Sequence, residues 1–371
     1  MLETTIFLYL IGCSGTEKNN DDTSVHTNQA DTGEDTAQTN IESTEMFFPE
    51  NNDSEWETVE PIDVFPAWDE DAEAALLHFL EERRTKSFMI LHNGYIVSEH
   101  YFNGHDKDSE WNWESAGKAL TSVMVGIAQQ EGFFDIHEPV STYLGTGWTS
   151  ASENQELQIT IRHLLTMTSG LDDRNGADVS PDNLQYLADA GTRWAYHNVF
   201  VTLHAVLANA VGQSWQTYFQ TKLRDPIGMN GSWNDMESRH LYTSNTRSMA
   251  RFGLLALNKG KWNDTQIVNE AYFLESTQSS QEHNPAYGYL WWINGQDRFL
   301  MPVLQEEYSG SIIFAGPDDM VMALGKHDQK VYVVPSSNMV VIRMGENASD
   351  PNLAISPFDI ELWERLSVLT Q

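Results

Sequence analysis

Two strand-like parts of the chain, separated by a long helical part, constrain most strongly what this sequence can fold into. In the first part, apolar runs at 88–91 and 95–97 flank His92-Asn93-Gly94, a sequence that favours a tight hairpin turn. Four further runs toward the C-terminus share the strand pattern: 287–293, 320–324, 330–334 and 339–343. Because helical patterns fill the middle and close the chain at 357–369, we expect an α/β (α+β) fold. Helices should flank an antiparallel sheet, and an all-helical lobe should span about 140–280.

The helix predicted over 113–128 carries the first candidate site. Its apolar residues recur at steps of three and four, so one face is buried. Ser115 and Lys118 lie on one side of its first turn, where free backbone amides favour developing negative charge. Such a pair can form a nucleophile and its base if burial or a neighbouring cation lowers the pKa of the lysine. Ser-x-x-Lys also occurs by chance, and a serine near a helix start is commonly only a cap, so further motifs must decide.

The composition of the chain argues against several kinds of ligand. Its formal charge is −33 over 371 residues, and a protein that binds a nucleic-acid backbone needs Lys and Arg residues that are scarce here. Cys13 is the only cysteine, so the chain has neither an internal disulfide nor a cysteine-based metal site. The loop acids Asp172, Asp173 and Asp178 lack the spacing of an EF-hand. We therefore expect no nucleic-acid partner, no metal and no cofactor.

The N-terminus has the pattern of a signal peptide. Residues 2–12 are apolar apart from three positions, and the segment is too short to span a bilayer. It ends in Leu10-Ile11-Gly12-Cys13, which resembles the lipobox of bacterial lipoproteins. The resemblance implies a lipoprotein signal peptide at 1–13 and a lipid anchor at Cys13. It places the protein in the bacterial cell envelope, at the outer membrane or the periplasmic face. A short apolar N-terminus with a chance cysteine is the alternative interpretation.

An acidic, polar segment follows the predicted anchor. Between residues 17 and 60 there are thirteen Asp or Glu residues and a single lysine, Lys18. A stretch of this composition cannot bury enough apolar surface to offset the entropy lost on ordering. We therefore expect a disordered tether over 14–60 and a folded domain over 61–371.

Two later motifs follow the serine helix along the chain. Tyr196-His197-Asn198 lies between a tryptophan and a helical run, and Lys326-His327-Asp328 ends an apolar strand. Each motif alone has an ordinary structural explanation, as a half-buried tyrosine or a solvated strand end. Ser-x-x-Lys, Tyr-x-Asn and a late basic strand motif in this order resemble the serine β-lactamase superfamily. The closest branch holds class C β-lactamases, D-alanyl-D-alanine peptidases, related esterases and nylon-oligomer hydrolases, and the resemblance covers roughly 70–371.

The resemblance implies a role for each motif residue. Ser115 is the acyl-accepting nucleophile, Lys118 is the base or proton shuttle, and Tyr196 transfers a proton near the leaving group. Four further residues are implied in substrate binding: Asn198, Lys326, His327 and Gln329. The backbone amides of Ser115 and Gln329 form the implied oxyanion hole.

The late motif departs from the family pattern, which is usually Lys-Thr-Gly or His-x-Gly. Asp328 takes the place of the glycine, and its charge would oppose an anionic substrate if the side chain faced the pocket. We therefore expect a serine hydrolase that acts on a small-molecule ester or small amide. A β-lactamase or D-alanyl-D-alanine carboxypeptidase is the alternative, and a non-catalytic binding or sensor protein on the same scaffold is a further one. A Ser-His-Asp α/β-hydrolase is disfavoured because no Gly-x-Ser-x-Gly occurs.

Overall fold

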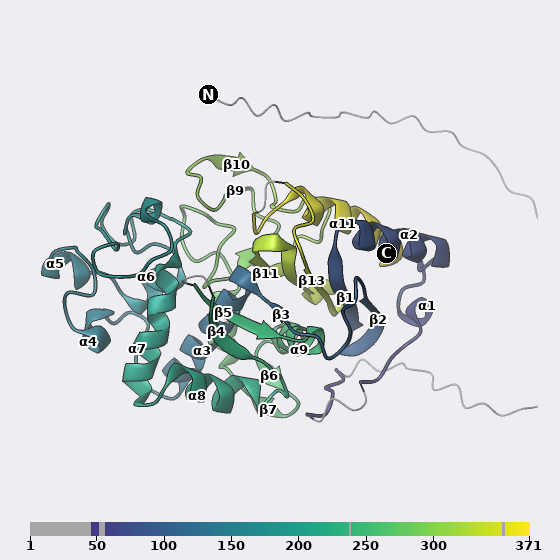
Figure 1. The fold of residues 1–371 in the computed structure, drawn as a ribbon, viewed down its shortest axis with the longest axis horizontal. Helices are drawn as coiled ribbons and strands as arrows, with labels where there is room; N and C mark the ends of the chain where they lie inside the picture. Colours follow the sequence, from purple (N-terminus) through teal and green to yellow (C-terminus); the bar gives the residue numbers. More distant parts are fainter. Residues whose placement is uncertain (1–45, 52–55, 237–238, 351–352) are drawn as a thin grey trace, which may run out of the picture. The chain divides into compact units, whose positions relative to one another are not determined.

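The structure is a computed structural model that describes residues 46–51, 56–236, 239–350 and 353–371 (Figure 1). The predicted signal peptide, the anchor at Cys13 and most of the predicted tether lie outside the described residues. Across the described ranges, no helix is both long and apolar enough to cross a membrane.

A six-stranded antiparallel sheet joins the two ends of the folded chain, in the strand order β2-β1-β13-β12-β11-β8. Its strands are β1 (Thr85–His92), β2 (Tyr95–Tyr101), β8 (Trp292–Ile293), β11 (Val321–Gly325), β12 (Gln329–Val334) and β13 (Met339–Gly345). The N-terminal strand β1 pairs directly with the C-terminal strand β13, with Ile90 opposite Val341 (Figure 1). The expected antiparallel sheet from both ends of the chain is therefore confirmed.

Helices cover both faces of this sheet. In β12, Val331 faces α9 (Thr246–Leu257), where its side chain lies 3.3 Å from the position that a Cβ would take at Gly253. The next residue, Tyr332, donates a 2.5 Å hydrogen bond to Asp359 of α11 (Pro357–Leu369). Because successive side chains of a strand point to opposite faces, α9 and α11 lie on opposite sides of the sheet. Helix α2 (Glu70–Glu82) packs beside α11 and against β1.

The chain packs onto the sheet earlier than residue 61. The ring of Phe47 stacks on Tyr95 at 4.9 Å between centroids. Trp56 is buried and donates a 2.7 Å hydrogen bond to the carbonyl of Gly94 in the hairpin turn. Phe47 and Trp56 thus bury apolar surface within a segment that is polar on average. The folded part therefore begins before residue 61, the predicted boundary.

The helical lobe is shorter than the predicted 140–280. Its helices are α4 (Ser141–Leu144), α5 (Glu153–Glu156), α6 (Ile161–Leu165), α7 (Thr202–Val211) and α8 (Trp215–Phe219). The chain then forms β4 (Ser232–Met236) and β5 (Arg239–Ser244), which join β3 (Trp111–Asn112) in a small sheet of order β3-β5-β4. Helix α9 lies on the large sheet instead of in the lobe.

The remaining helices and strands are short. They are α1 (Pro61–Val64), α10 (Glu270–Ser276), β6 (Lys261–Trp262), β7 (Thr265–Gln266), β9 (Arg298–Leu300) and β10 (Glu307–Ser309).

The helix predicted over 113–128 consists of two elements. A tight 3-10 turn spans Glu114–Gly117, and the buried helix α3 spans Lys118–Gln130. Helix α3 packs closely on α10, because a Cβ at Gly126 would lie 2.4 Å from the ring of Tyr272. Ser115 therefore sits in a 3-10 turn, and Lys118 is the first residue of a helix held firmly in the core.

Candidate active site

Ser115 and Lys118 are in direct contact. The Nζ atom of Lys118 donates a 2.8 Å hydrogen bond to the Oγ atom of Ser115. The lysine is only 6% exposed, so its amine is largely removed from water. The predicted pair is thus brought together by the junction between the 3-10 turn and α3.

The surroundings of Lys118 favour its neutral form. Its Nζ lies 4.7 Å from the ring centre of Tyr196 and 4.4 Å from that of Phe200. Burial lowers the pKa of Lys118 to about 7, while Glu114 acts in the raising direction and Arg239 in the lowering direction. A substantial fraction of this amine is therefore uncharged near neutral pH and can accept the proton of Ser115.

Tyr196 lies beside Ser115 and Lys118. Its ring stacks on Trp292, with centroids 5.7 Å apart, and also contacts Trp194 and Tyr287. Burial raises the pKa of Tyr196, and the neighbouring Ser115 hydroxyl acts in the opposite direction. The phenol therefore keeps its proton at neutral pH, and its position beside Ser115 and Lys118 suits proton transfer.

Strand β11 approaches the 3-10 turn that carries Ser115 (Glu114–Gly117) at Gly325, a residue that the sequence did not single out. A Cβ at Gly325 would lie 2.5 Å from the Trp113 carbonyl oxygen and 3.0 Å from the Ala116 nitrogen. Any side chain would push the strand away from the turn. The late motif therefore does have a glycine that lets the strand lie close to the site. It is Gly325, three residues before Asp328, where the sequence predicted that the glycine was lost.

Asp328 does not face the pocket, so the repulsion predicted for an anionic substrate is wrong. Its side chain is fully buried, and it accepts hydrogen bonds from Ser356 Oγ at 2.6 Å and from the Ala348 amide at 3.0 Å. Its Oδ1 lies 3.2 Å from the Nζ atom of Lys330. The inward direction follows from a left-handed turn, with φ of 60° at His327 and 59° at Asp328.

The four residues implied in substrate binding differ in burial and in hydrogen-bond partners. The amide of Asn198 donates a 2.7 Å hydrogen bond to the Ala177 carbonyl, and Lys326 is exposed. Gln329 is buried, and its side chain donates a 2.6 Å hydrogen bond to the carbonyl of Gly345. Of the four, only His327 lines the cavity beside the turn that carries Ser115.

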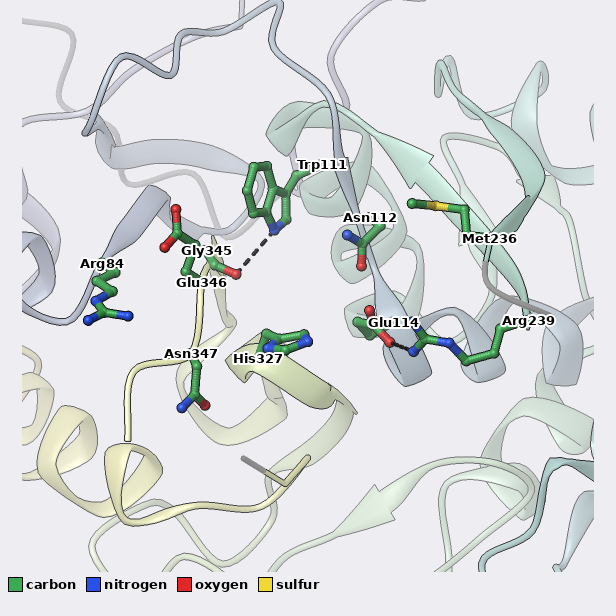
Figure 2. A pocket seen from close by; sticks show the side chains of 10 residues that line it. All are labelled: Arg84, Trp111, Asn112, Glu114, Met236, Arg239, His327, Gly345, Glu346 and Asn347. Atoms are coloured by element: carbon green, nitrogen blue, oxygen red, sulfur yellow. Dashed lines mark hydrogen bonds and ion pairs between the residues drawn. The ribbon is translucent and has the colours of Figure 1, made fainter. Parts of the chain in front are cut away.

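A cavity of about 430 Å³ adjoins the turn that carries Ser115, with Glu114 of that turn in its lining. Its lining includes Arg84, Trp111, Glu114, Arg239 and His327 (Figure 2). Figure 2 shows Arg84 on one side of this space and the Glu114–Arg239 ion pair on the other. The lining combines apolar side chains such as Trp111 with side chains of both charges, so it offers hydrogen-bonding groups to a ligand.

Sequence reasoning missed the Glu114–Arg239 ion pair in the cavity lining. The only signal for Glu114 was its place next to Ser115, and Arg239 lies 125 positions away along the chain. The described residues also contain no group of three or more His, Cys, Asp or Glu side chains that could hold a metal ion.

Comparisons with known proteins agree with this geometry. A family model named Beta-lactamase matches residues 73–346. An uncharacterized protein of Alkalihalophilus pseudofirmus is 27% identical over 305 residues, which are 71% of this chain and 84% of that protein.

Two solved structures share the fold at low identity. One is described as a 6-aminohexanoate-dimer hydrolase of Bacillus anthracis, with a TM-score of 0.62, 21% identity, and coverage of 80% of this chain and 83% of that one. The other is a penicillin-binding protein of Bacillus halodurans, with a TM-score of 0.57, 15% identity, and coverage of 77% and 97%. The family model covers most of the chain and includes Ser115, Lys118 and Tyr196. The chain therefore belongs to the Beta-lactamase family, within the serine β-lactamase superfamily of hydrolases.

Proposed function

We propose that this protein is a serine hydrolase that acts through an acyl-enzyme on an ester or small amide. The observation that carries the proposal is the 2.8 Å hydrogen bond between Lys118 Nζ and Ser115 Oγ, in a site where burial lowers the pKa of the lysine to about 7. A serine hydroxyl is a weak nucleophile until a base takes its proton, and this lysine has both the position and the basicity to do so.

The proposed acylation step uses three side chains. Lys118 accepts the proton of Ser115 while the Oγ atom attacks the substrate carbonyl carbon. Lys118 and Tyr196 then deliver a proton to the leaving group, which departs from the acyl carbon on the side where these two residues lie. In the second step the same groups take a proton from a water molecule, which attacks the acyl carbon, and they return that proton to the Oγ atom of Ser115 as the acyl group leaves as the acid.

Backbone amides would stabilise the tetrahedral intermediate. Ser115 lies in the first turn of a 3-10 helix, where amides lack partners within the helix. The strand that reaches this turn is β11, at Gly325, so we propose this part of β11 in place of Gln329 as the second side of the oxyanion hole. Losing one such donor typically costs about 2.7–4 kcal/mol of transition-state stabilisation.

We favour an ester or small amide because two features expected of a β-lactam site differ in this protein. The Asn198 amide is bonded to the Ala177 carbonyl, and the turn at His327 and Asp328 replaces the extended strand of the usual late motif. Both features weaken the case for a site built around a β-lactam. The alternative, a β-lactamase or D-alanyl-D-alanine carboxypeptidase, is supported by the likeness to the Bacillus halodurans penicillin-binding protein.

Parallel labelling tests this proposal. Purified protein is treated with a fluorescent fluorophosphonate or with a fluorescent penicillin, each in the wild type and in Ser115→Ala. We expect fluorophosphonate labelling that disappears in Ser115→Ala and little labelling by penicillin. Strong penicillin labelling together with faster turnover of nitrocefin than of p-nitrophenyl butyrate would favour the alternative. Absence of labelling by both probes would support a non-catalytic protein.

We also propose that Cys13 anchors the protein in the bacterial cell envelope. The support is the Leu10-Ile11-Gly12-Cys13 sequence followed by an acidic, polar segment. Membrane and soluble fractions of cells that express the wild type or Cys13→Ser provide the test. Equal partitioning of both proteins into the soluble fraction would contradict the anchor.

A further inference from the structure

The residue before the nucleophile has an unusual backbone conformation. Glu114 has a φ of 47°, which is left-handed, and its side chain is only 6% exposed. A residue with a Cβ occupies this region only when its surroundings compensate for the strain, and such residues gather at functional sites. A buried carboxylate also needs a partner, because an isolated charge away from water is costly.

That partner is Arg239 at the start of β5. Its Nη1 atom donates a 2.5 Å hydrogen bond to the Oε2 atom of Glu114. The pair thus ties the turn that carries Ser115 to the small sheet, across a long separation in sequence. Both side chains line the cavity beside the nucleophile (Figure 2).

We propose that Glu114 and Arg239 form a positioning pair, which holds the backbone at Ser115 and balances the electric field at the amine of Lys118. This inference depends on the proposed function for its consequence in catalysis. We do not place either residue in contact with the reacting atoms. Both act on the reaction through Ser115 and Lys118.

Two charged side chains act on Lys118, and they come from different elements. Glu114 lies in the 3-10 turn and Arg239 on β5, while Tyr196 faces the amine as a neutral phenol. Glu114 favours the charged amine and Arg239 disfavours it, so each offsets the other. Removing one partner also exposes Lys118 to the full charge of the other, so the two single variants must shift its titration in opposite directions.

Two titrations of the full chain test this pair. One follows kcat/KM for p-nitrophenyl acetate against pH, and the other follows the Lys118 side chain by 13C-lysine NMR, with its resonance assigned by its loss in Lys118→Arg. We expect Glu114→Gln to move both midpoints down by about one pH unit and Arg239→Met to move them up by about one, as for a unit charge within roughly 10 Å of a buried amine.

Two matched variants control for indirect effects. Arg239→Lys keeps the positive charge and should restore the midpoint to within about 0.3 pH units of the wild type. Glu99→Gln breaks another partly buried ion pair, with Arg247, on strand β2 at the far edge of the sheet, and should leave both midpoints unchanged.

Unchanged midpoints in both single variants, or shifts in the same direction, would overturn the inference. If the wild type hydrolyses no ester, the proposed function fails, but the NMR midpoints still decide whether the pair acts on Lys118. If the NMR midpoints shift in opposite directions while the pH profiles of kcat/KM stay unchanged, the charges of Glu114 and Arg239 act on Lys118 but Lys118 is not the base. That result would overturn the catalytic part of the inference.

Discussion

Replacing Lys118 with methionine should make the protein more stable near neutral pH. Burial lowers the pKa of this lysine from 10.5 to about 7, so between those values the unfolded chain binds a proton that the folded protein does not. At 1.36 kcal/mol per unit, the full difference corresponds to about 5 kcal/mol, of which about 4 kcal/mol applies at pH 7 and about 2 kcal/mol at pH 9. Losing the hydrogen bond to Ser115 costs the variant about 1 kcal/mol at every pH.

The predicted difference therefore changes sign with pH. Lys118→Met should be more stable than the wild type by about 3 kcal/mol at pH 7, by about 1 kcal/mol at pH 9, and less stable by about 1 kcal/mol at pH 11. Urea unfolding at the three pH values measures it, with the exposed Lys107→Met as a control whose difference should not depend on pH. A stability difference for Lys118→Met that is flat from pH 7 to 11 would refute a lowered lysine pKa, and with it the assignment of Lys118 as base.

Three further substitutions test the site and its support. Tyr196→Phe should lower kcat by about a hundredfold or more while the melting temperature changes little, and a rate within threefold of the wild type would remove Tyr196 from proton transfer. Gly325→Ala should reduce kcat/KM by about a hundredfold, because the new Cβ would meet the Trp113 carbonyl at 2.5 Å, and a kcat/KM within threefold of the wild type would contradict the need for this close approach. Asp328→Asn should cost about 3 kcal/mol of stability at pH 7 without changing the ratio of ester to nitrocefin turnover, and a changed ratio would restore a direct role in specificity.

The stability supplied by Asp328 also depends on pH. Burial acts to raise the pKa of Asp328, but Lys330 and the hydrogen bonds from Ser356 and Ala348 hold it below the usual range. Its contribution is therefore present above the unfolded pKa of about 3.9 and is lost as pH falls through the lower folded value. The penalty of Asp328→Asn, measured by urea unfolding, should shrink in strong acid, and a penalty that grows there would contradict this linkage.

Periodic patterns predicted the framework of the fold. Helix α11 has the predicted bounds, and strands β1 and β2 meet at Asn93-Gly94, whose φ values of 48° and 84° are those of a tight hairpin. Such elements depend on residues close in sequence, so the sequence alone defines them. The two-residue strand β3 is too short to carry a periodic signal, and β8 occupies only the last two residues of the strand predicted over 287–293.

The site was predictable where a motif is local and unpredictable where it depends on distant partners. Ser115 and Lys118 are three residues apart, and their contact follows from the turn that joins them. The direction of Asp328 depends on Ser356 and Ala348, and the role of Glu114 depends on Arg239. These pairings form only when separate strands and helices pack together, so the spacing of residues along the chain could not reveal them.

The most direct test of the account is to locate the covalent adduct. The protein is treated with a fluorophosphonate, digested with trypsin and sequenced by tandem mass spectrometry; the peptide that ends at Lys118 contains both Ser109 and Ser115. We predict that the fragment ions place the adduct on Ser115 and that Ser115→Ala carries none. An adduct on Ser109 or on another residue, with ester hydrolysis retained in Ser115→Ala, would contradict the central claim.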